Sequence, residues 1–499
     1  MSGRYATLSA VTDDQSTAPP TAVSARRLSG DDLARLTGGQ LLSRSSRPIR
    51  GAAVDSRLVE PGQLFVALAG ERTDGHRFLG DAVARGAAAL VVGRDPQDPA
   101  ALGDAFGDAL RDVTIVRVDD PLRALQAVAA HWRTLFDPLV VGVTGSIAKT
   151  STKEAVAAVL GARFRTLKNE GNQNNEIGLP LTVLRLGREH EAAVLEMGMY
   201  VGGEIADLAR IGRPKIGIVT AVQPVHLSRI GTIEAIERAK GELVEALPAD
   251  GRAILNADDA RVRRMASRTA AAVTTYGFAA DVDVSAEEIE SAGVDGMRFV
   301  LRTPVGRRPI AIPTLGRLAV HNALAGAAAG LAAGLTLDEI AAGLGAGWAA
   351  PHRTQLVRAG GVTLVDDSYN ASPASVEAAL ELLGGLPGRR VAVLGEMLEL
   401  GDAHEAGHRE VGEAAAGVVK LLVVVGTGAS AIADGAVAAG MDAERVLRVA
   451  DRDQARAALA TRLRPGDVVL VKASRGVELD LLVDALQADL SAAATGAAR

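Results

Sequence analysis

The sequence predicts an α/β protein built from three domains, and three observations carry this prediction. The chain has 499 residues, too many for one hydrophobic core, since domains usually hold about 100–200 residues. Short apolar runs that read as buried strands alternate with helical segments. Boundaries are expected at Asp137–Pro138 and between residues 348 and 351. We therefore expect a flexible tail over 1–25 and three domains over 26–137, 138–348 and 349–499.

The first domain is expected to be a small α/β unit. Its apolar segments alternate with glycine turns, so that 63–68 and 88–92 read as strands and 82–85 as a helix. The preceding tail is rich in Ser, Thr, Ala and Pro and lacks the long apolar stretch of an export signal. These features predict a cytoplasmic protein.

The other two domains show the strand, loop and helix repeat of mainly parallel sheets. In the central domain we expect strands at 192–195 and 216–220 and a helix at 233–246. In the C-terminal domain four apolar runs predict a doubly wound, Rossmann-like sheet. These runs are 362–365, 390–394, 421–425 and 467–471.

Composition excludes several classes of function. A net charge of −6 disfavours a broad basic surface for nucleic acid, so no nucleic-acid partner is expected. The chain has no cysteine, which leaves oxygen and imidazole groups as metal ligands, and Mg²⁺ fits that inventory. The most apolar long window, 318–337, is mostly Ala and Gly and includes His321 and Asn322. It therefore predicts a tightly packed helix and not a membrane span.

The most informative segment is the apolar run that begins at Leu139 and ends in a loop before Lys149–Thr150. It approaches the phosphate-binding pattern G-x-x-x-x-G-K-[ST], with Val143 and Ala148 at the two glycine positions. Backbone N–H groups of such a loop surround a phosphate, while the lysine reaches its outer oxygens and the hydroxyl ligates Mg²⁺. The alternative is an ordinary glycine turn between strand and helix. We expect Ala148 to have a negative φ, because its methyl group is compatible with a helical start.

Further polar residues follow strands of the central domain. Glu196 directly follows a strand and could bring a carboxylate to an ion held by Thr150. His226 could ligate a second metal, whereas the free ammonium of Lys240 could not. For His226 and Lys240, a plain surface position is the competing interpretation.

Two polar clusters could bind a ligand. Residues 171–180 contain a run of amides, including Asn174 and Asn175, that suits a polar ligand but also suits turns and helix caps. Residues 366–370 follow a buried strand, where ligands of such sheets bind. In contrast, 425–431 fits the dinucleotide fingerprint G-x-G-x-x-[GA], but any tight β–α turn needs such glycines. We favour this structural interpretation and expect no binding of NAD.

Together these segments resemble the Mur ligase family, in the right order over nearly the whole chain after the tail. The loop over 144–150 resembles the family's short form T-G-[ST]-x-G-K-[ST], from which only Ala148 departs. Residues 55–57 and 70–78 resemble its N-terminal motifs for the UDP-sugar, and 174–178, 196–198, His226 and 239–242 its central ATPase motifs. Residues 367–373 and 394–401 resemble the member that adds D-alanyl-D-alanine. The family's H-N-x-x-N pattern is only partly kept, because Leu318 and Ala319 replace its first two residues.

The resemblance implies a central domain of the P-loop ATPase type, with the ligands distributed over three domains. It places ATP on Gly145, Ser146, Ile147, Ala148, Lys149, Thr150, Ser151, Asn322, Arg353 and Asp367. It places the two substrates on Ser56, Arg57, Asn174, Asn175, Tyr369, Asn370, Lys472, Ser474 and Arg475, of which the last three would serve the dipeptide or the reacting phosphate. It implies two Mg²⁺ ions on Thr150, Glu196, His226 and Lys240, with Lys240 carboxylated at its amine, which removes the objection to it as a ligand. Catalysis would rest on Lys149, Lys240, His226 and Glu196.

The implied activity is an ATP-dependent ligation in peptidoglycan precursor synthesis. The carboxylate of UDP-N-acetylmuramoyl-tripeptide would take the γ-phosphate of ATP, and the amine of D-alanyl-D-alanine would displace phosphate from the acyl phosphate. We expect the chain to act as a monomer. The alternatives are a sibling ligase that adds a single amino acid, a folylpolyglutamate-type ligase, and a non-catalytic nucleotide-binding regulator with a degenerate loop.

Overall fold

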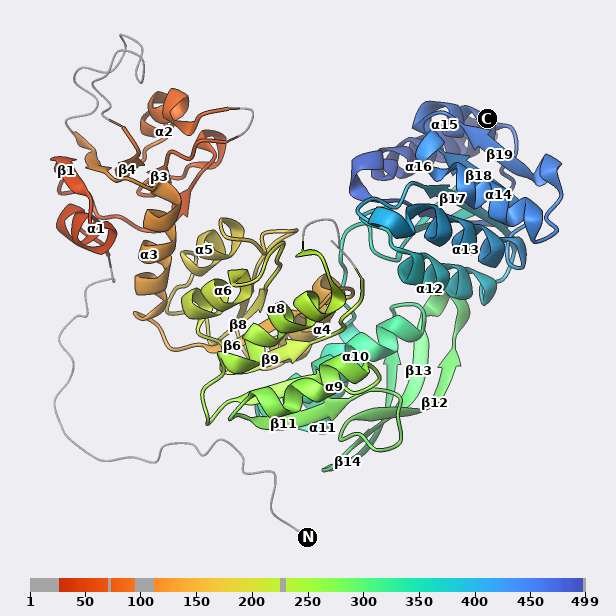
Figure 1. The fold of residues 1–499 in the computed structure, drawn as a ribbon, viewed down its shortest axis with the longest axis horizontal. Coiled ribbons are helices and arrows are strands. Elements are labelled where there is room, and N and C mark those ends of the chain that lie inside the picture. The colour runs from red at the N-terminus through yellow and green to blue at the C-terminus, as the bar shows by residue number, and fades with distance from the viewer. Residues whose placement is uncertain (1–26, 71–72, 95–111, 225–229, 497–499) are drawn as a thin grey trace.

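The computed structural model describes residues 27–70, 73–94, 112–224 and 230–496. Three lobes follow one another along the chain, and the N-terminal and C-terminal lobes stand on opposite sides of the central one (Figure 1). This architecture confirms the expected α/β fold class. The expected tail over 1–25 lies outside the described residues.

The N-terminal lobe is a five-stranded sheet of order β1-β5-β4-β3-β2, in which only the β1–β5 pair is antiparallel. The two predicted strands and the short helix of this lobe are β3, β4 and α2, within a few residues of the expected bounds. The elements are α1 Gly30–Thr37, β1 Gln40–Ser43, β2 Ala52–Ala53, β3 Leu64–Val66, α2 Leu79–Ala84, β4 Ala89–Val92, β5 Thr114–Arg117 and α3 Pro121–Arg133.

The central lobe contains a parallel six-stranded sheet of order β11-β10-β9-β6-β8-β7. Its strands are β6 Leu139–Thr144, β7 Thr166–Lys168, β8 Ala192–Glu196, β9 Ile216–Val219, β10 Arg252–Asn256 and β11 Ala272–Tyr276. Its helices are α4 Lys149–Gly161, α5 Gly178–Val183, α6 Glu204–Gly212, α8 Ile233–Glu245, α9 Ala260–Arg264, α10 Arg317–Ala332 and α11 Leu337–Ala346. An antiparallel three-stranded sheet is added by β12 Ser285–Ser291, β13 Met297–Thr303 and β14 Gly306–Ile312.

The apolar window over 318–337 is the helix α10 for most of its length, and it packs against α4. A Cβ at Gly330 would lie 2.7 Å from a methyl carbon of Val159, and one at Gly326 would lie 3.3 Å from the carbonyl oxygen of Ala155. Small residues are therefore required where the two helices meet, and this contact supports α4, which begins at Lys149. Within the described parts of the chain, no helix is long and apolar enough to cross a membrane.

The C-terminal lobe is a six-stranded sheet of order β15-β16-β20-β17-β18-β19, parallel except for the edge strand β15. The four predicted strands are β16, β17, β18 and β20. The strands are β15 Gln355–Ala359, β16 Val362–Asp366, β17 Arg389–Gly395, β18 Leu421–Val425, β19 Val446–Val449 and β20 Asp467–Lys472. The helices are α12 Pro373–Gly384, α13 His404–Ala416, α14 Ser430–Ala438, α15 Arg452–Ala460 and α16 Leu479–Gly496.

Candidate functional site

The loop between β6 and α4 is fastened to the segment that follows β9. Ser146 donates from its backbone N–H to Ala221 and from its hydroxyl to the carbonyl oxygen of Gln223, at 2.8 and 3.0 Å. The Thr220 hydroxyl donates to the carbonyl oxygen of Ile147 at 2.6 Å. A Cβ at Gly145 would lie 1.9 Å from that hydroxyl oxygen, so only glycine fits there. The loop is thus built as a rigid turn at the carboxyl end of the sheet.

Ala148 has a φ of +63°, and the expected negative φ is wrong. The residue is the N-cap of α4, and its carbonyl oxygen accepts the backbone N–H of Thr152 at 2.8 Å. A left-handed residue here turns successive backbone N–H groups toward one side, as phosphate-binding loops do. The methyl group makes this conformation cost about 1 kcal/mol relative to glycine. Ala148 therefore has the backbone conformation of a glycine.

The Lys149 amine folds back over the loop. It donates to the carbonyl oxygens of Gly145 and Ser146 at 2.8 and 3.3 Å. Burial lowers the pKa of Lys149, although the nearby Glu196 carboxylate opposes this effect. The amine is therefore held where the loop could bring it to an anion.

Glu196, the last residue of β8, joins several of the predicted residues in one network. Its Oε1 accepts the Thr150 hydroxyl at 3.1 Å and the Asn174 amide at 2.7 Å. Its Oε2 is buried and has no hydrogen-bond partner within the described residues. An orphaned carboxylate oxygen beside a hydroxyl is a fitting position for Mg²⁺, which prefers oxygen ligands.

No cluster of three or more Asp, Glu, His or Cys that could hold a metal ion is found among the residues that the structure describes. Mg²⁺ usually keeps several waters and binds through one or two carboxylates plus phosphate oxygens of a substrate. A site at Thr150 and Glu196 would accordingly be completed by nucleotide and water.

Lys240 lies on α8 and is only 2% exposed. Its amine has no hydrogen bond or ion pair with the described residues. Burial, and secondarily the charge of Lys149, lowers the pKa of Lys240 well below its usual range. His226, predicted as its partner, lies outside the described residues. Burial therefore favours the neutral form of this amine, which is the form that can react with an electrophile.

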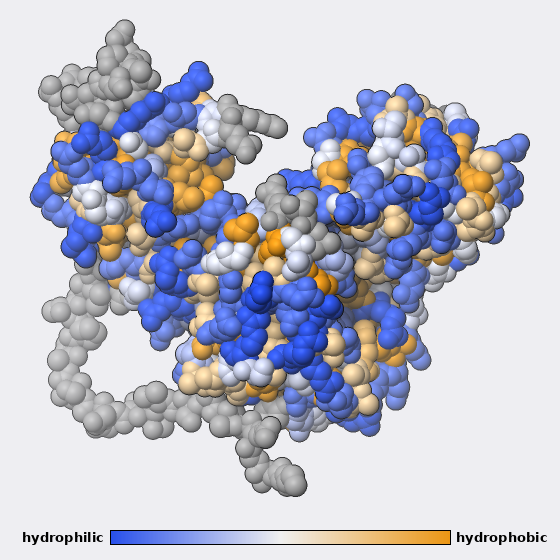
Figure 2. Space-filling view, in the orientation of Figure 1, coloured by the Kyte–Doolittle hydropathy of each residue, from blue (hydrophilic) through white to orange (hydrophobic). Residues whose placement is uncertain are grey.

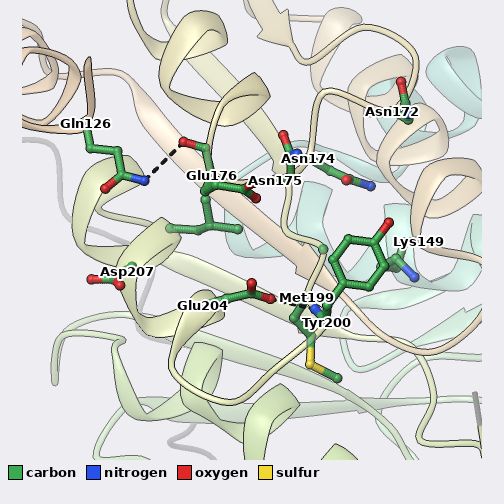
Figure 3. A pocket seen from close by; sticks show the side chains of 12 residues that line it. Gln126, Lys149, Asn172, Asn174, Asn175, Glu176, Met199, Tyr200, Glu204 and Asp207 are labelled. Carbon is green, nitrogen blue, oxygen red and sulfur yellow. Dashed lines mark hydrogen bonds between the residues drawn. The ribbon is translucent and has the colours of Figure 1, made fainter. Parts of the chain in front are cut away.

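The two amides of the 171–180 run have different partners. Asn174 binds Glu196, whereas the Asn175 side chain accepts the backbone N–H groups of Ile177 and Gly178 and so caps α5. Both amides line a pocket that reaches Gln126 on α3 of the N-terminal lobe, whose amide donates to the Glu176 carbonyl oxygen at 3.1 Å (Figure 3). Figure 3 also shows Lys149 and Tyr200 at the opposite end of this pocket.

A cleft of about 390 Å³ separates the phosphate-type loop from the C-terminal lobe. The N-terminal and C-terminal lobes flank a hollow over the central lobe in the space-filling view (Figure 2). Residues 146–151 line one wall of the cleft. The other wall carries Arg353, Asp367, Tyr369, Asn370, Lys472, Ser474 and Arg475. The structure thus brings most of the predicted ATP and substrate residues to one cleft.

Lys472 and Asp367 form an ion pair on the C-terminal wall, with 2.6 Å between Nζ and Oδ2. The same amine donates to the Asn370 carbonyl oxygen at 2.8 Å, and the backbone N–H of Thr354 donates to the other oxygen of Asp367 at 3.0 Å. Ser474 accepts the backbone N–H of Leu398 at 2.9 Å. These contacts make the C-terminal wall rigid.

Asn322 lies beside the cleft in a smaller cavity, which Leu318, Ala319, Trp348 and Arg353 also line. Its Oδ1 accepts the Thr152 hydroxyl from α4 at 3.0 Å. The two residues that depart from the family's pattern, Leu318 and Ala319, therefore face the same space as Asn322.

Ser56 and Arg57 are not brought to the cleft. They lie in the N-terminal lobe on a short 3₁₀ turn, where Arg57 pairs with Asp55 and its side chain is 83% exposed. The dinucleotide-like turn over 425–431 does not line the cleft either. A Cβ at Gly428 would lie 2.3 Å from the Glu396 carboxyl carbon, so close packing supports the structural interpretation of this glycine.

Two residues of the network escaped the sequence analysis. Lys153 is fully buried, donates to the Asn169 carbonyl oxygen at 2.7 Å and lies 4.0 Å from Oε2 of Glu196. The Asn169 side chain makes both backbone hydrogen bonds of Glu196, at 2.9 and 3.0 Å. The spacing of Lys153, one helical turn after Lys149, was the available signal.

Three family matches cover most of the described chain. They are the Mur ligase family catalytic domain over 48–133, the Mur ligase middle domain over 143–330, and the Mur ligase glutamate ligase domain over 352–475.

Similar curated proteins share one name, UDP-N-acetylmuramoyl-tripeptide–D-alanyl-D-alanine ligase. The Bacillus subtilis protein is 35% identical, with 89% of this chain and 94% of that protein covered. The Escherichia coli K12 protein is 39% identical, with 87% of this chain and 92% of that protein covered.

Solved structures agree with this placement. MurF from Acinetobacter baumannii superposes with a TM-score of 0.82 at 30% identity, covering 93% of this chain and all of that one. MurF from Thermotoga maritima in complex with ADP superposes with a TM-score of 0.76 at 28% identity, covering 88% of this chain and 98% of that one. A folylpolyglutamate synthase from Mycobacterium tuberculosis shares the fold alone. It superposes with a TM-score of 0.58 at 18% identity and covers 72% of this chain and 93% of that one. With its loop, its Glu196 network and its facing C-terminal wall, the chain belongs to the Mur ligase family.

Proposed function

We propose that this chain joins D-alanyl-D-alanine to UDP-N-acetylmuramoyl-tripeptide at the expense of ATP in peptidoglycan precursor synthesis. The observation that carries the proposal is the cleft in which the Lys149 loop faces a wall to which residues of 367–373 and 394–401 contribute. The latter segments resemble the dipeptide-adding member, and the curated relatives carry that activity in their name.

The reaction has two steps. The terminal carboxylate of the tripeptide attacks the γ-phosphorus of ATP, which forms an acyl phosphate and releases ADP. The dipeptide amine then attacks the acyl carbon, the C–O bond to phosphate breaks, and the amine proton leaves. In both steps the protein mainly positions the reactants and stabilises charge on the phosphoryl oxygens. Lys149 is placed for this task by the loop carbonyl oxygens that hold its amine.

The ligands are distributed over the three lobes. Asn322, Arg353 and Asp367 hold ATP together with the loop over 145–151. Ser56 and Arg57 serve the UDP-sugar, and the tripeptide passes the pocket at Gln126 and Asn174 to reach Lys149. The dipeptide lies against Tyr369 and Asn370, while Lys472, Ser474 and Arg475 serve the dipeptide or the reacting phosphate. The protein acts as a monomer in the cytoplasm.

Thr150, Glu196, His226 and Lys240 hold Mg²⁺ in this proposal. Bound by these residues, the ions would supply positive charge that polarises the phosphate oxygens and neutralises the charge developing on them. The orphaned Oε2 of Glu196 supports this assignment.

Lys240 becomes a ligand through carboxylation of its amine. The neutral nitrogen attacks the carbon of CO₂, an N–C bond forms while one C=O π pair moves onto oxygen, and a nitrogen-bound proton leaves to solvent, which gives the carbamate. Burial and the absence of a partner among the described residues support this reaction, since only the neutral amine is nucleophilic. A carbamate carbon signal in NMR with ¹³C-bicarbonate is expected from the wild type and not from Lys240→Gln. Its presence in both proteins would exclude Lys240 as the site.

Release of phosphate tests the function. We expect release only when ATP, UDP-N-acetylmuramoyl-tripeptide and D-alanyl-D-alanine are all present. Release with a single amino acid in place of the dipeptide would instead identify a sibling ligase. No release with any acceptor, together with intact ATP binding, would identify a regulator.

A further inference from the structure

Tyr369 lies against two arginines on the C-terminal wall of the cleft. The guanidinium carbon of Arg353 is 4.2 Å from the centre of the Tyr369 ring, and that of Arg475 is 5.2 Å away. Arg475 also donates to the Tyr369 hydroxyl at 3.1 Å. One aromatic ring therefore organises two cations that come from segments more than 100 residues apart in the sequence.

Arg353 belongs to the connection between the central and C-terminal lobes, but it is fastened to the latter. Its neighbours His352 and Thr354 both have left-handed backbones, with φ of +58° and +52°. His352 pairs with Asp366 at 2.7 Å, and the Thr354 N–H donates to Asp367 at 3.0 Å. Left-handed non-glycine residues persist only where the surroundings hold them. These contacts fix Arg353 at the end of β16, next to Tyr369.

The two arginines face the phosphate-type loop. Both line the cleft whose opposite wall carries Lys149. Two guanidinium groups held around one ring repel each other, and the negative face of the aromatic ring offsets that repulsion. An isolated contact of this kind stabilises a cation by an amount that corresponds to about 2- to 5-fold in binding. A ligand carrying several negative charges would add the strongest stabilisation.

We propose that Tyr369 is a positioning residue that holds Arg353 and Arg475 as a two-cation clamp for the transferring phosphoryl group. The proposal rests on the proposed ligase function, because it takes the phosphoryl group of ATP as the ligand. Tyr369 acts through the arginines, and its ring, more than its hydroxyl, carries the effect.

Binding of a non-hydrolysable ATP analogue with Mg²⁺, measured by calorimetry on the full chain, tests the clamp. Tyr369→Leu removes the ring, and we expect about 5- to 30-fold weaker binding from the loss of two contacts. Tyr369→Phe is the matched control and should stay within about 3-fold of the wild type, because it keeps the ring. Tyr369 is half-buried at the cleft, so circular dichroism should show an unchanged fold for both variants.

A double-mutant cycle with Arg353→Met separates the clamp from a direct contact of Tyr369 with the nucleotide. If Tyr369 acts through the arginines, Tyr369→Leu should weaken binding much less in the Arg353→Met background than in the wild type. The same loss in both backgrounds, a Phe variant as weak as Leu, or a Leu variant equal to wild type would overturn the proposal. Should Tyr369→Leu misfold, Arg475→Met gives the same test, since its effect should depend on the ring at 369.

The two proposals can fail separately. Wild-type phosphate release that requires both substrates, with analogue binding indifferent to Tyr369, would remove the clamp and leave the ligase function. If analogue binding is weakened by Tyr369→Leu and not by Tyr369→Phe, but no dipeptide causes phosphate release, the ligase function would be removed and the arginine clamp for nucleotide phosphate would remain.

Discussion

Thr150 donates a 3.1 Å hydrogen bond to Oε1 of Glu196, although 46 positions separate the two residues in the sequence. The contact follows from the topology. The strands β6 and β8 are parallel neighbours, and Glu196 pairs in register with Val143, just before the loop that leads to Thr150. Adjacent parallel strands place their carboxyl ends at one edge, which is where a hydroxyl and a carboxylate can share an ion.

Glu196→Gln should weaken metal binding. The amide keeps the shape of the side chain but removes the charge and one oxygen, so we expect about 10- to 100-fold lower affinity for Mn²⁺ in the ADP complex. Electron paramagnetic resonance of bound Mn²⁺ measures this directly. Glu189→Gln is the control, because that carboxylate is exposed on a loop near β8. Equal Mn²⁺ affinity in both variants would exclude Glu196 as a metal ligand.

Ala148→Gly should stabilise the protein. Glycine relieves the strain of the +63° φ, while it adds freedom to the unfolded chain, and the balance is about 0.5–1 kcal/mol in favour of the variant. Urea unfolding measures the difference. Ala162→Gly, at the end of the same helix with a φ of −64°, should instead lose about 0.5–1 kcal/mol. A loss at both positions would contradict the left-handed assignment of Ala148.

Lys153→Met should be strongly destabilising. It leaves the Asn169 carbonyl oxygen without its donor and removes the cation that lies 3.0 Å from the buried Glu154 carboxylate and 4.0 Å from that of Glu196. A buried ion pair that loses one partner costs about 3–5 kcal/mol. Lys168→Met is the matched control, because Lys168 pairs with Glu154, as Lys153 does, but is 43% exposed. That change should cost about 0–1 kcal/mol in urea unfolding. Similar costs for the two variants would mean that burial of Lys153 does not decide its contribution.

The strands that were predicted share one property. The runs that became β8, β16, β17, β18 and β20 are almost continuously apolar because both faces of a parallel sheet are covered, so hydropathy alone marks them. The strands β12 and β14 carry exposed charges such as Glu290 and Arg307. Additional polar residues obscure the two-residue alternation of apolar and polar side chains that would mark them as strands. That antiparallel sheet was therefore missed.

Site residues could be predicted where a ligating or phosphate-binding side chain lies at or shortly after the end of a strand, as at Lys149, Thr150, Glu196 and Asp367. Features of the site that depend on contacts between residues far apart in the sequence could not be predicted. The φ of Ala148 is set by a loop that is fastened to Thr220 and Gln223, more than 70 positions away. The network of Lys153 likewise depends on the carbonyl oxygen of Asn169, whose position no local pattern encodes.

His408, on α13 of the C-terminal lobe, should make local stability depend on pH. It is completely buried, its Nε2 accepts the backbone N–H of Met397 at 2.9 Å, and its Nδ1 lies 2.6 Å from the His404 carbonyl oxygen. The ring is therefore neutral, with its proton on Nδ1. Burial, as the main cause, lowers the pKa of His408 below its usual 6.5.

The sign of the effect follows from linkage. Below pH 6.5 the unfolded chain takes up a proton that folded His408 does not, so stability should fall as the pH falls, by up to about 1.4 kcal/mol per pH unit. Hydrogen exchange of the peptide containing Met397, corrected for intrinsic rates between pH 7.5 and 5, measures this slope. In His408→Gln the amide oxygen can still accept the Met397 N–H, but the titrating group is gone, so the slope should flatten. A slope identical to that of the wild type would show that another group carries the pH dependence of this segment.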